Sequence, residues 1–367
     1  MNRRIDSSQN QIKKQRGQIM KIGNRKVKLA ISLAIVTAIS MGTVSANAAS
    51  SAPKEVDLSG YTLTVADSGG LFKVMCAAYS CDTGADYKIN WVTFATGPEA
   101  LAAAVGGSVQ MASTGMAPAV FAAAAKQPVK IVAVTAPQRT PGALFSIVAS
   151  KKSFDAGVTT MAGLRGKSLA LSMGTEGEYL AIVALKKAQV PLTSVGFNNL
   201  GPAAAMSALN TGAVGAAVLV EPFLSMAKAA GAQVLATGNG NLAGYFAFWQ
   251  STKTMKNPKA VAATNDLLVR WQKMYKQFSI DRTGGIAIFS KTFFPTYPAA
   301  VATPLATVLY DGSVAGFAPI DDVVIKAFQD EADVMYQVGN IKRKLNMANW
   351  FDAKLYEKTL KALPKVK

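Results

Sequence analysis

The same pattern of apolar and polar positions occurs twice in this chain, over residues 97–134 and again over residues 201–238. Each segment starts with Gly-Pro and continues with an Ala-rich run, a glycine and a short apolar run. A polar break, a second Ala-rich run and a last apolar run follow in both. Two copies predict two similar α/β lobes, because a solenoid would need several stacked repeats. Two lobes imply a cleft, where small molecules bind.

The repeat extends upstream of both segments. Strand-like runs at 61–66 and 167–172 each lead through a glycine-containing turn into an apolar helix, and further strands follow at 86–94 and 195–200. Each lobe therefore reads βαβαβαβ, which is typical of a mostly parallel sheet covered by helices.

Ligands in such sheets bind beyond the carboxyl ends of the strands, where loops enter the next helix. This rule selects four loops, at 67–70, 113–116, 173–177 and 221–222. Each could be a connecting turn without a ligand. Their matching places in the two lobes favour one shared cleft.

The first 48 residues have the pattern of a secretory signal peptide. A basic stretch over 21–28 precedes a largely apolar run of 13 residues at 29–41, and Ala46-Asn47-Ala48 forms an A-x-A cleavage site. Met20 is an alternative start. An uncleaved signal anchor is the other interpretation, but the apolar run is short for a membrane span. We expect a soluble periplasmic protein.

Charge and cysteine content add two expectations. Residues 1–48 hold nine of the 39 basic and one of the 21 acidic residues, which leaves the rest of the chain at a net charge of +10. Its lysines are scattered rather than clustered, so a solvated surface is expected and a nucleic-acid partner is not.

In an exported protein the two cysteines, Cys76 and Cys81, can form a small-loop disulfide. Two free thiols are the alternative.

The chain has no histidine, which excludes Ser-His-Asp and Cys-His catalysis and histidine metal sites. No phosphate-loop, dinucleotide-binding or serine-hydrolase motif stands at a strand–helix junction. We therefore expect a binding protein rather than an enzyme, with neither a cofactor nor a metal site.

Several short motifs, taken in order, resemble one family. They are Glu99-Ala100-Leu101, Ser113-Thr114-Gly115, Gly174 to Tyr179, Ala208 to Gly212, and Glu221-Pro222. This pattern is similar to the periplasmic substrate-binding proteins of ABC importers, in the nitrate/sulfonate/taurine branch. The chain departs from that pattern at Gln110 and Gly215, where the family often has Asp, and at Glu176 and Gly177, where it often has hydroxyl groups.

The resemblance implies a bilobed type II fold, with two α/β domains of mostly parallel sheets joined by two hinge strands around a ligand cleft. Lobe 1 would comprise residues 49–140 and 245–367, and lobe 2 residues 141–244. It also implies a monomer that closes on a small solute and delivers it to a membrane permease with its ATPase.

Helix N-termini and exposed backbone N–H groups favour an anion, and an arginine can hold a carboxylate or sulfonate with two bonds. Helix caps and tight turns are the structural alternative for these residues. The candidate ligand-binding residues are Ser68, Gly69, Gly70, Thr114, Gly115, Arg139, Gly174, Thr175, Glu176, Gly177 and Glu221.

Glu176 complicates an anion site, because a carboxylate repels an anion. Its side chain could point to solvent, accept from an amine, amide or hydroxyl of a zwitterionic or polar ligand, or pair with Arg139 or a lysine of the cleft. The expected ligand is accordingly a small organic anion or zwitterion with a sulfonate or carboxylate end. The alternatives are an exported enzyme that uses Glu176 with Glu178 or Glu221 as acid and base, and a ligand-loaded partner of a sensor.

Overall fold

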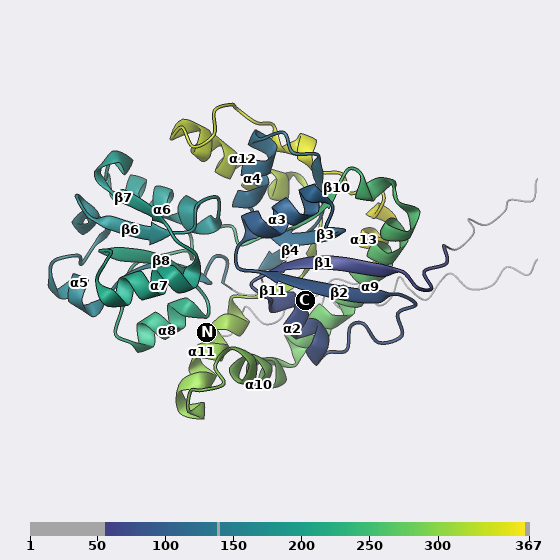
Figure 1. The fold of residues 1–367 in the computed structure, drawn as a ribbon, viewed down its shortest axis with the longest axis horizontal. Helices are drawn as coiled ribbons and strands as arrows, with labels where there is room; N and C mark the ends of the chain where they lie inside the picture. The colour runs from purple at the N-terminus through teal and green to yellow at the C-terminus, as the bar shows by residue number, and fades with distance from the viewer. Residues whose placement is uncertain (1–55, 138–139, 364–367) are drawn as a thin grey trace, which may run out of the picture. The chain divides into compact units, whose positions relative to one another are not determined.

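The computed structural model describes residues 56–137 and 140–363, and the predicted signal peptide lies outside them. The described chain forms two β-sheets, both flanked by helices (Figure 1). Among these residues no helix is long and apolar enough to cross a membrane.

The first sheet has six strands in the order β11-β4-β10-β3-β1-β2. β1, β2 and β3 are mutually parallel, whereas β10 runs antiparallel to β3 and β4, and β11 antiparallel to β4. The strands are β1 (Thr62–Ser68), β2 (Lys88–Phe94), β3 (Met111–Thr114), β4 (Val129–Pro137), β10 (Phe246–Ser251) and β11 (Val314–Ala318).

The second sheet has five strands in the order β7-β6-β8-β5-β9. β6, β7 and β8 are parallel, and β5 runs antiparallel to β8 and β9. The strands are β5 (Phe145–Ala149), β6 (Ser168–Leu171), β7 (Gly196–Asn199), β8 (Ala216–Val220) and β9 (Gln233–Thr237).

Helices alternate with the strands in both sheets, as β1-α2-β2-α3-β3-α4-β4 and as β6-α6-β7-α7-β8-α8-β9. The βαβαβαβ order predicted for each lobe is therefore confirmed, and so is the α/β class, with two mixed sheets that each contain three mutually parallel strands. The helices are α2 (Leu71–Ala78), α3 (Gly97–Gly106), α4 (Ala117–Ala124), α6 (Glu176–Lys187), α7 (Pro202–Thr211) and α8 (Phe223–Ala229).

The antiparallel strands β5 and β10 mark the places where the chain changes sheets. It leaves the first sheet at the end of β4 and enters the second as β5, and it returns after β9 as β10. β5 and β10 each follow a strand of the other sheet with no helix between them among the described residues, and both run antiparallel to their neighbours. These are the two connections predicted to join the lobes.

Two element boundaries differ from the predicted ones. β1 continues through Asp67 and Ser68, because these residues pair with Thr93 and Phe94 of β2. α6 begins at Glu176, inside the predicted loop 173–177, because the Thr175 side chain accepts a hydrogen bond from the Gly177 N–H and caps the helix there. Glu176 is thus the first residue of a helix.

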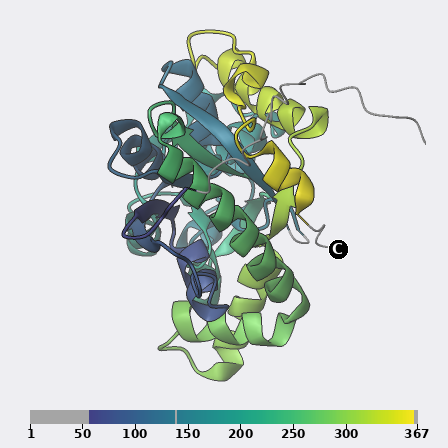
Figure 2. The same cartoon turned by 90° about the vertical axis from the view of Figure 1, so that its right-hand side faces the viewer.

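The C-terminal part of the chain adds helices around the first sheet. In Figure 2 the green helix α9 crosses this face of the protein, with the yellow C-terminal segments above it. α9 begins at Pro258 after the Asn257 cap and contacts α2, β1 and β11, and α12 contacts α4. The helices are α9 (Pro258–Ile280), α10 (Arg282–Phe293), α11 (Ala299–Asp311), α12 (Asp322–Gln337) and α13 (Glu357–Ala362).

Shorter helical segments connect these elements. They are α5 (Lys151–Asp155) and the 3-10 helices η1 (Met161–Leu164), η2 (Leu192–Ser194), η3 (Thr254–Lys256) and η4 (Met347–Trp350).

Aromatic side chains form the core between the first sheet and α9. The ring of Trp271 stacks on Trp91 and Phe72, with centroids 5.7 and 6.0 Å apart. Trp271 and Phe72 are buried. Aromatic pairs of this kind stabilise a core beyond the area that they bury.

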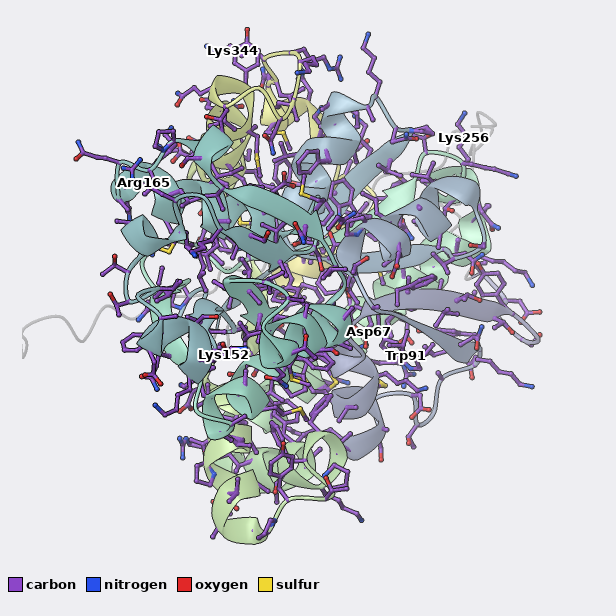
Figure 3. The ribbon with its side chains drawn as sticks, turned by 60° about the vertical axis from the view of Figure 1, so that its left-hand side comes forward. Asp67, Trp91, Lys152, Arg165, Lys256 and Lys344 are labelled. Atoms are coloured by element: carbon purple, nitrogen blue, oxygen red, sulfur yellow. A yellow bond between two sulfur atoms is a disulfide. The ribbon has the colours of Figure 1, made fainter. Side chains whose placement is uncertain are left out.

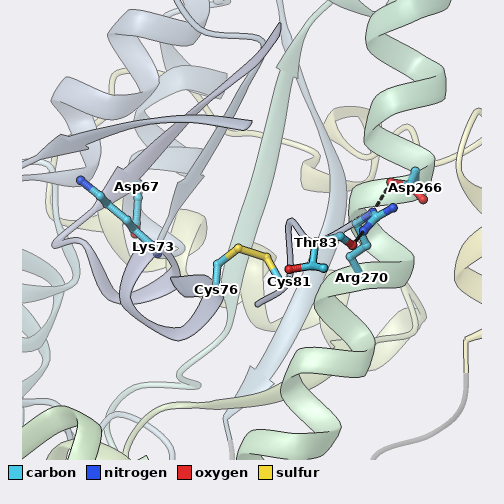
Figure 4. Close-up of a disulfide and its surroundings, with 7 residues drawn as sticks. All are labelled: Asp67, Lys73, Cys76, Cys81, Thr83, Asp266 and Arg270. Atoms are coloured by element: carbon cyan, nitrogen blue, oxygen red, sulfur yellow. Dashed lines mark hydrogen bonds and ion pairs between the residues drawn. A yellow bond between two sulfur atoms is a disulfide. The ribbon is translucent and has the colours of Figure 1, made fainter. Parts of the chain in front are cut away.

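A disulfide joins Cys76 to Cys81 and ties the last turn of α2 to the turn that follows (Figure 4). Arg270 of α9 donates to the carbonyl oxygens of Thr83 and Gly84, at 2.7 and 2.8 Å. Both links hold the loop after α2 against α9.

Basic side chains lie on the outside of the described structure. Arg165, Lys256 and Lys344 project from the rim of the ribbon in Figure 3, and all three are exposed. Asp67, labelled in the same view, lies within the fold and is buried. This distribution agrees with a solvated basic surface.

Candidate functional site

A cavity of about 150 Å³ lies between the two sheets, with walls from both. Among the described residues, six helices begin at this cavity: α2, α3, α4, α6, α7 and α8. Their first turns contribute Leu71, Gly97, Glu176, Gly177 and Pro202 to the wall. Each helix N-terminus carries a partial positive charge and N–H groups without intrahelical partners. The cavity therefore favours negative charge.

Other parts of the wall are apolar or acidic. Leu144, Phe246, Phe293 and Leu309 supply apolar surface, whereas Glu176, Glu221 and Glu331 supply carboxylates. No lysine or arginine lines the cavity in the part of the chain that the structure describes. Arg139, which was predicted to bind the anionic group of the ligand, lies outside the described residues.

Glu176 reaches from the second lobe to the first. Its Oε1 accepts a hydrogen bond from the N–H of Ala117, the first residue of α4, at 2.9 Å. Gly115 makes this approach possible, since a Cβ at that position would overlap with the Glu176 carboxylate. None of the three interpretations of Glu176 from the sequence included this contact.

Glu331 of α12 is the second carboxylate of this region. It is 3% exposed, and its Oε1 has no hydrogen-bond partner among the described residues. Burial, together with the negative charge of Glu176, raises the pKa of Glu331 well above its usual value. Burial also raises the pKa of Glu176, although hydrogen bonds from the Ala117 and Met116 N–H groups oppose the shift. The two groups therefore resist being ionised together.

Glu221 caps α8. Its two carboxylate oxygens accept from the Ser225 N–H and Oγ, at 3.1 and 2.9 Å. Burial raises the pKa of Glu221 to about 7, against the opposing effect of these bonds. The Glu221–Pro222 peptide bond is cis, and both residues line the cavity.

Glu178 does not line the cavity. Its oxygens accept from the Gly174 N–H at 2.7 Å and from the Asn340 side chain at 2.5 Å. It thus holds the loop before α6 and links that loop to the segment after α12. Glu176 and Glu178 point to different partners, as expected for residues two apart on a helix.

Thr114 is fully buried and lies outside the cavity wall. Its Oγ1 donates to the Gly115 carbonyl oxygen at 2.8 Å and accepts from the Trp249 indole N–H at 2.9 Å. These bonds engage the hydroxyl inside the first sheet, between β3 and β10.

The cavity brings together seven of the eleven predicted ligand residues. Gly70, Thr114 and Gly174 stand beside it without lining it, and Arg139 is not described. The seven that line it are Ser68, Gly69, Gly115, Thr175, Glu176, Gly177 and Glu221.

Glu331 was missed by the sequence reasoning. It lies on the same face of α12 as the buried residues Val324, Phe328 and Met335. A carboxylate at helical spacing within an apolar face is the signal that could have found it, because such a group seldom stays buried without a partner.

Two α/β lobes that enclose a cavity at the carboxyl ends of their parallel strands are the arrangement expected of a periplasmic substrate-binding protein. No family model matches the chain. A protein of Escherichia coli (strain K12), named as a candidate aliphatic sulfonates-binding protein, is 29% identical over 262 residues, which cover 71% of this chain and 78% of that protein.

Solved structures agree with this assignment. The periplasmic aliphatic sulphonate binding protein SsuA from Escherichia coli is 26% identical, with a TM-score of 0.65 over 81% of this chain and 99% of that one. The alkanesulfonate-binding protein SsuA from Xanthomonas axonopodis pv. citri, bound to MOPS, has the same fold, with 24% identity and a TM-score of 0.66 over 80% and 99% of the two chains. The predicted resemblance to the nitrate/sulfonate/taurine branch is therefore confirmed.

Proposed function

We propose that this protein is the extracytoplasmic solute-binding component of an ABC importer, and that it captures a small organic sulfonate or carboxylate in the cavity between its lobes. The observation that carries this proposal is the meeting of six helix N-termini at one cavity. Oriented N–H groups and helix dipoles bind anions without a cationic side chain. The relatives named for sulfonates support the same ligand class.

The start of α2 is the proposed seat of the anionic group. Ser68 and Gly69 line the cavity there. No atom other than those of its chain neighbours lies within 4 Å of the position that a Cβ would take at Gly69, among the described residues. A ligand oxygen can therefore approach this backbone closely. One N–H group in the first turn of α2, α4, α6 and α8 is already bonded to a side chain, that of Asp67, Glu176, Thr175 and Glu221 respectively.

The lobe boundaries stay part of the proposal. Residues 49–140 with 245–367 would form one lobe and residues 141–244 the other. The strands support this division, because those of the second sheet come only from Phe145–Ala149 through Gln233–Thr237. The lobes would close on the ligand about the connections before β5 and before β10.

The proposed partners are a membrane permease and its ATPase, and the protein would act as a soluble periplasmic monomer after cleavage of the signal peptide. Residues 1–48 carry the signal-peptide pattern.

Calorimetric titration of the purified protein tests the function. Alkanesulfonates, aminosulfonates, aromatic carboxylates and nitrate are compared with uncharged and purely cationic compounds of the same size. We expect saturable binding of at least one organic anion or zwitterion. Binding of only uncharged or cationic compounds would contradict the proposal.

An exported enzyme is the second candidate, because perturbed carboxyl groups such as Glu176 and Glu221 line the cavity. Mass spectrometry of each bound compound after prolonged incubation separates the two functions. A binding protein returns the compound unchanged, whereas a new product would favour the enzyme.

A further inference from the structure

Two carboxylates from different lobes meet at the cavity. Glu176 comes from α6 of the second lobe, and Glu331 from α12, which packs on α4 of the first. Both side chains line the wall, and the charge of one acts on the other. A cavity at which helix N-termini favour an anion thus contains a separate acidic region.

Of the two carboxylates, Glu331 is the one whose lack of a hydrogen-bond partner needs an explanation. Its Oε1 is buried and has no partner among the described residues, although it lines a cavity. A buried carboxylate without a partner destabilises a protein, and such groups in native structures are normally paired or hydrogen-bonded. The missing partner is therefore one that the cavity receives from outside.

We infer that Glu331 and Glu176 form a second subsite in the cavity, which binds a cationic amine of the ligand. This inference rests on the proposed function, since the sulfonate would occupy the start of α2 while the amine lies between the two carboxylates. An ammonium group offers three N–H donors and one positive charge. It therefore satisfies the free oxygen of Glu331 and relieves the repulsion between Glu331 and Glu176.

The other charged groups near Glu331 do not replace this partner. On its own helix, Asp330 pairs with Lys326 at the surface. From α6, Tyr179 lies close enough for Glu331 to raise its pKa, and Glu178 is bonded to Gly174 and Asn340.

The elements that pack on α12 supply no described positive charge to the pair. Helix α4 has no titratable side chain. The Arg343 guanidinium, which follows α12, donates to the Ala123 carbonyl oxygen at the far end of α4. Lys186, on the last turn of α6, donates to Gln337.

The subsite predicts a proton change on binding. Without ligand, mutual repulsion keeps a proton on the pair to a higher pH than usual. An ammonium between the carboxylates favours their ionised forms, so a ligand with an amine should release protons near neutral pH. A sulfonate without an amine should release none from this pair.

Three sulfonates of similar size test the subsite: 2-aminoethanesulfonate, 2-hydroxyethanesulfonate and propane-1-sulfonate. Each is titrated into the purified protein in two buffers with different ionisation enthalpies, which gives both the affinity and the protons released. We expect the aminosulfonate to bind about tenfold or more tightly than the other two, as for a charge-assisted hydrogen bond, and to be the only one that releases protons.

Substitution assigns the effect to the pair. Glu331→Gln keeps the shape of the side chain and removes its charge, so the advantage of the aminosulfonate should fall to about threefold or less and its proton release should diminish. Glu176→Gln should act in the same direction if Glu331→Gln does not fold. Asp330→Asn is the matched control, because it removes a carboxylate from the exposed face of the same helix. It should leave all three affinities within about twofold of the original.

Equal affinities for the three sulfonates, or an advantage of the aminosulfonate that Glu331→Gln leaves intact, would overturn the cation subsite and leave sulfonate binding in place. Equal binding of the amine and the hydroxyl compound would likewise overturn it, since a neutral donor would then suffice. If none of the three sulfonates binds but an organic carboxylate does, the subsite as stated fails and the proposed function stands, whereas the absence of binding by any organic anion makes both fail.

Discussion

The two lobes repeat one order of strands and helices but cap the corresponding helices differently. In the second lobe, α6 is capped by Thr175, the residue directly before it, and α8 by Glu221 of the preceding loop. In the first lobe, Asp67 accepts from Lys73 in α2, whereas α4 receives its carboxylate from Glu176 of the other lobe. The caps of α2, α6 and α8 therefore come from their own lobe, whereas the cap of α4 comes from the other lobe.

This difference places one hydrogen bond between the lobes at the cavity itself, in addition to those from Asn340 to Glu178 and from Lys186 to Gln337 outside it. A cap within a lobe persists whether the cleft is open or closed, but the bond from Ala117 to Glu176 exists only when the lobes approach. The local caps should therefore govern stability, and the cap across the lobes should govern ligand binding.

The largest effect should come from pH, through the two local carboxylate caps. Burial raises the pKa of Asp67 in the first lobe and of Glu221 in the second to about 7, from 3.8 and 4.5. The folded protein then binds more protons than the unfolded chain. Stability from each group is fully present below its unfolded pKa and is lost as the pH rises towards 7. At full ionisation the loss is about 4 kcal/mol for Asp67 and about 3 kcal/mol for Glu221.

Urea unfolding between pH 4 and 8 measures this loss. The free energy of unfolding should fall with rising pH in the unmodified protein, and less steeply in both Asp67→Asn and Glu221→Gln. If both variants kept the full slope, the caps would not be its source. A flatter curve in only one variant would limit the effect to one lobe.

Gly115→Ala should break the cap across the lobes. The new Cβ would overlap with the Glu176 carboxylate, a side chain of the other lobe that can withdraw. The hydrogen bond to Ala117 is then lost, and the closed form becomes less favourable relative to the open one. A bond to a charged group contributes about 1.5–3 kcal/mol, so ligand affinity should fall by about tenfold or more.

Gly106→Ala is the matched control for Gly115→Ala. It lies in the same lobe, at the end of α3, and no atom lies near the position of its Cβ among the described residues. Calorimetric titration with the best ligand should show full affinity for Gly106→Ala. Unchanged affinity in Gly115→Ala would mean that the contact across the lobes does not contribute to closure.

The Thr114→Val variant tests whether Thr114, a predicted ligand-binding residue, contributes to stability rather than to ligand binding. The substitution keeps the shape but leaves the buried Trp249 N–H without its acceptor. The free energy of unfolding should fall by about 1–3 kcal/mol, with ligand affinity nearly unchanged. Thr114→Ser retains the hydroxyl and should preserve most of the stability. A variant of normal stability and weak binding would place Thr114 at the ligand after all.

Local sequence signals predicted much of the fold. The Gly-Pro starts of α3 and α7 could be recognised in the sequence because proline fits the first turn of a helix. The order of the strands within each sheet was not readable, since apolar strands that are buried on both faces look alike and only packing decides their neighbours.

The candidate site was likewise only partly predictable from the sequence. Loops at the ends of strands could be located from the pattern, so Ser68, Gly115 and Glu176 were found. Glu331 lies far along the chain on a helix that resembles any amphipathic surface helix, and only the packing of α12 on α4 turns it to the cavity. The hydroxyl of Thr114 was expected at the ligand, but its bond to Trp249 depends on the pairing of β3 with β10.

The smallest effect should come from the local cap of α6. Thr175 Oγ1 accepts from the Gly177 N–H at 3.1 Å and donates to the Ser172 carbonyl oxygen at 2.6 Å. Thr175→Ala removes both bonds and should lower the free energy of unfolding by about 1 kcal/mol, whereas Thr175→Ser should retain most of it. Thermal unfolding measures the difference. If the cap serves only the helix, ligand affinity should change by less than about threefold, since Glu176 still reaches Ala117. A larger loss of ligand affinity in Thr175→Ala, with normal stability, would show that the cap of α6 and the cap of α4 are coupled. The position of Glu176 would then depend on Thr175.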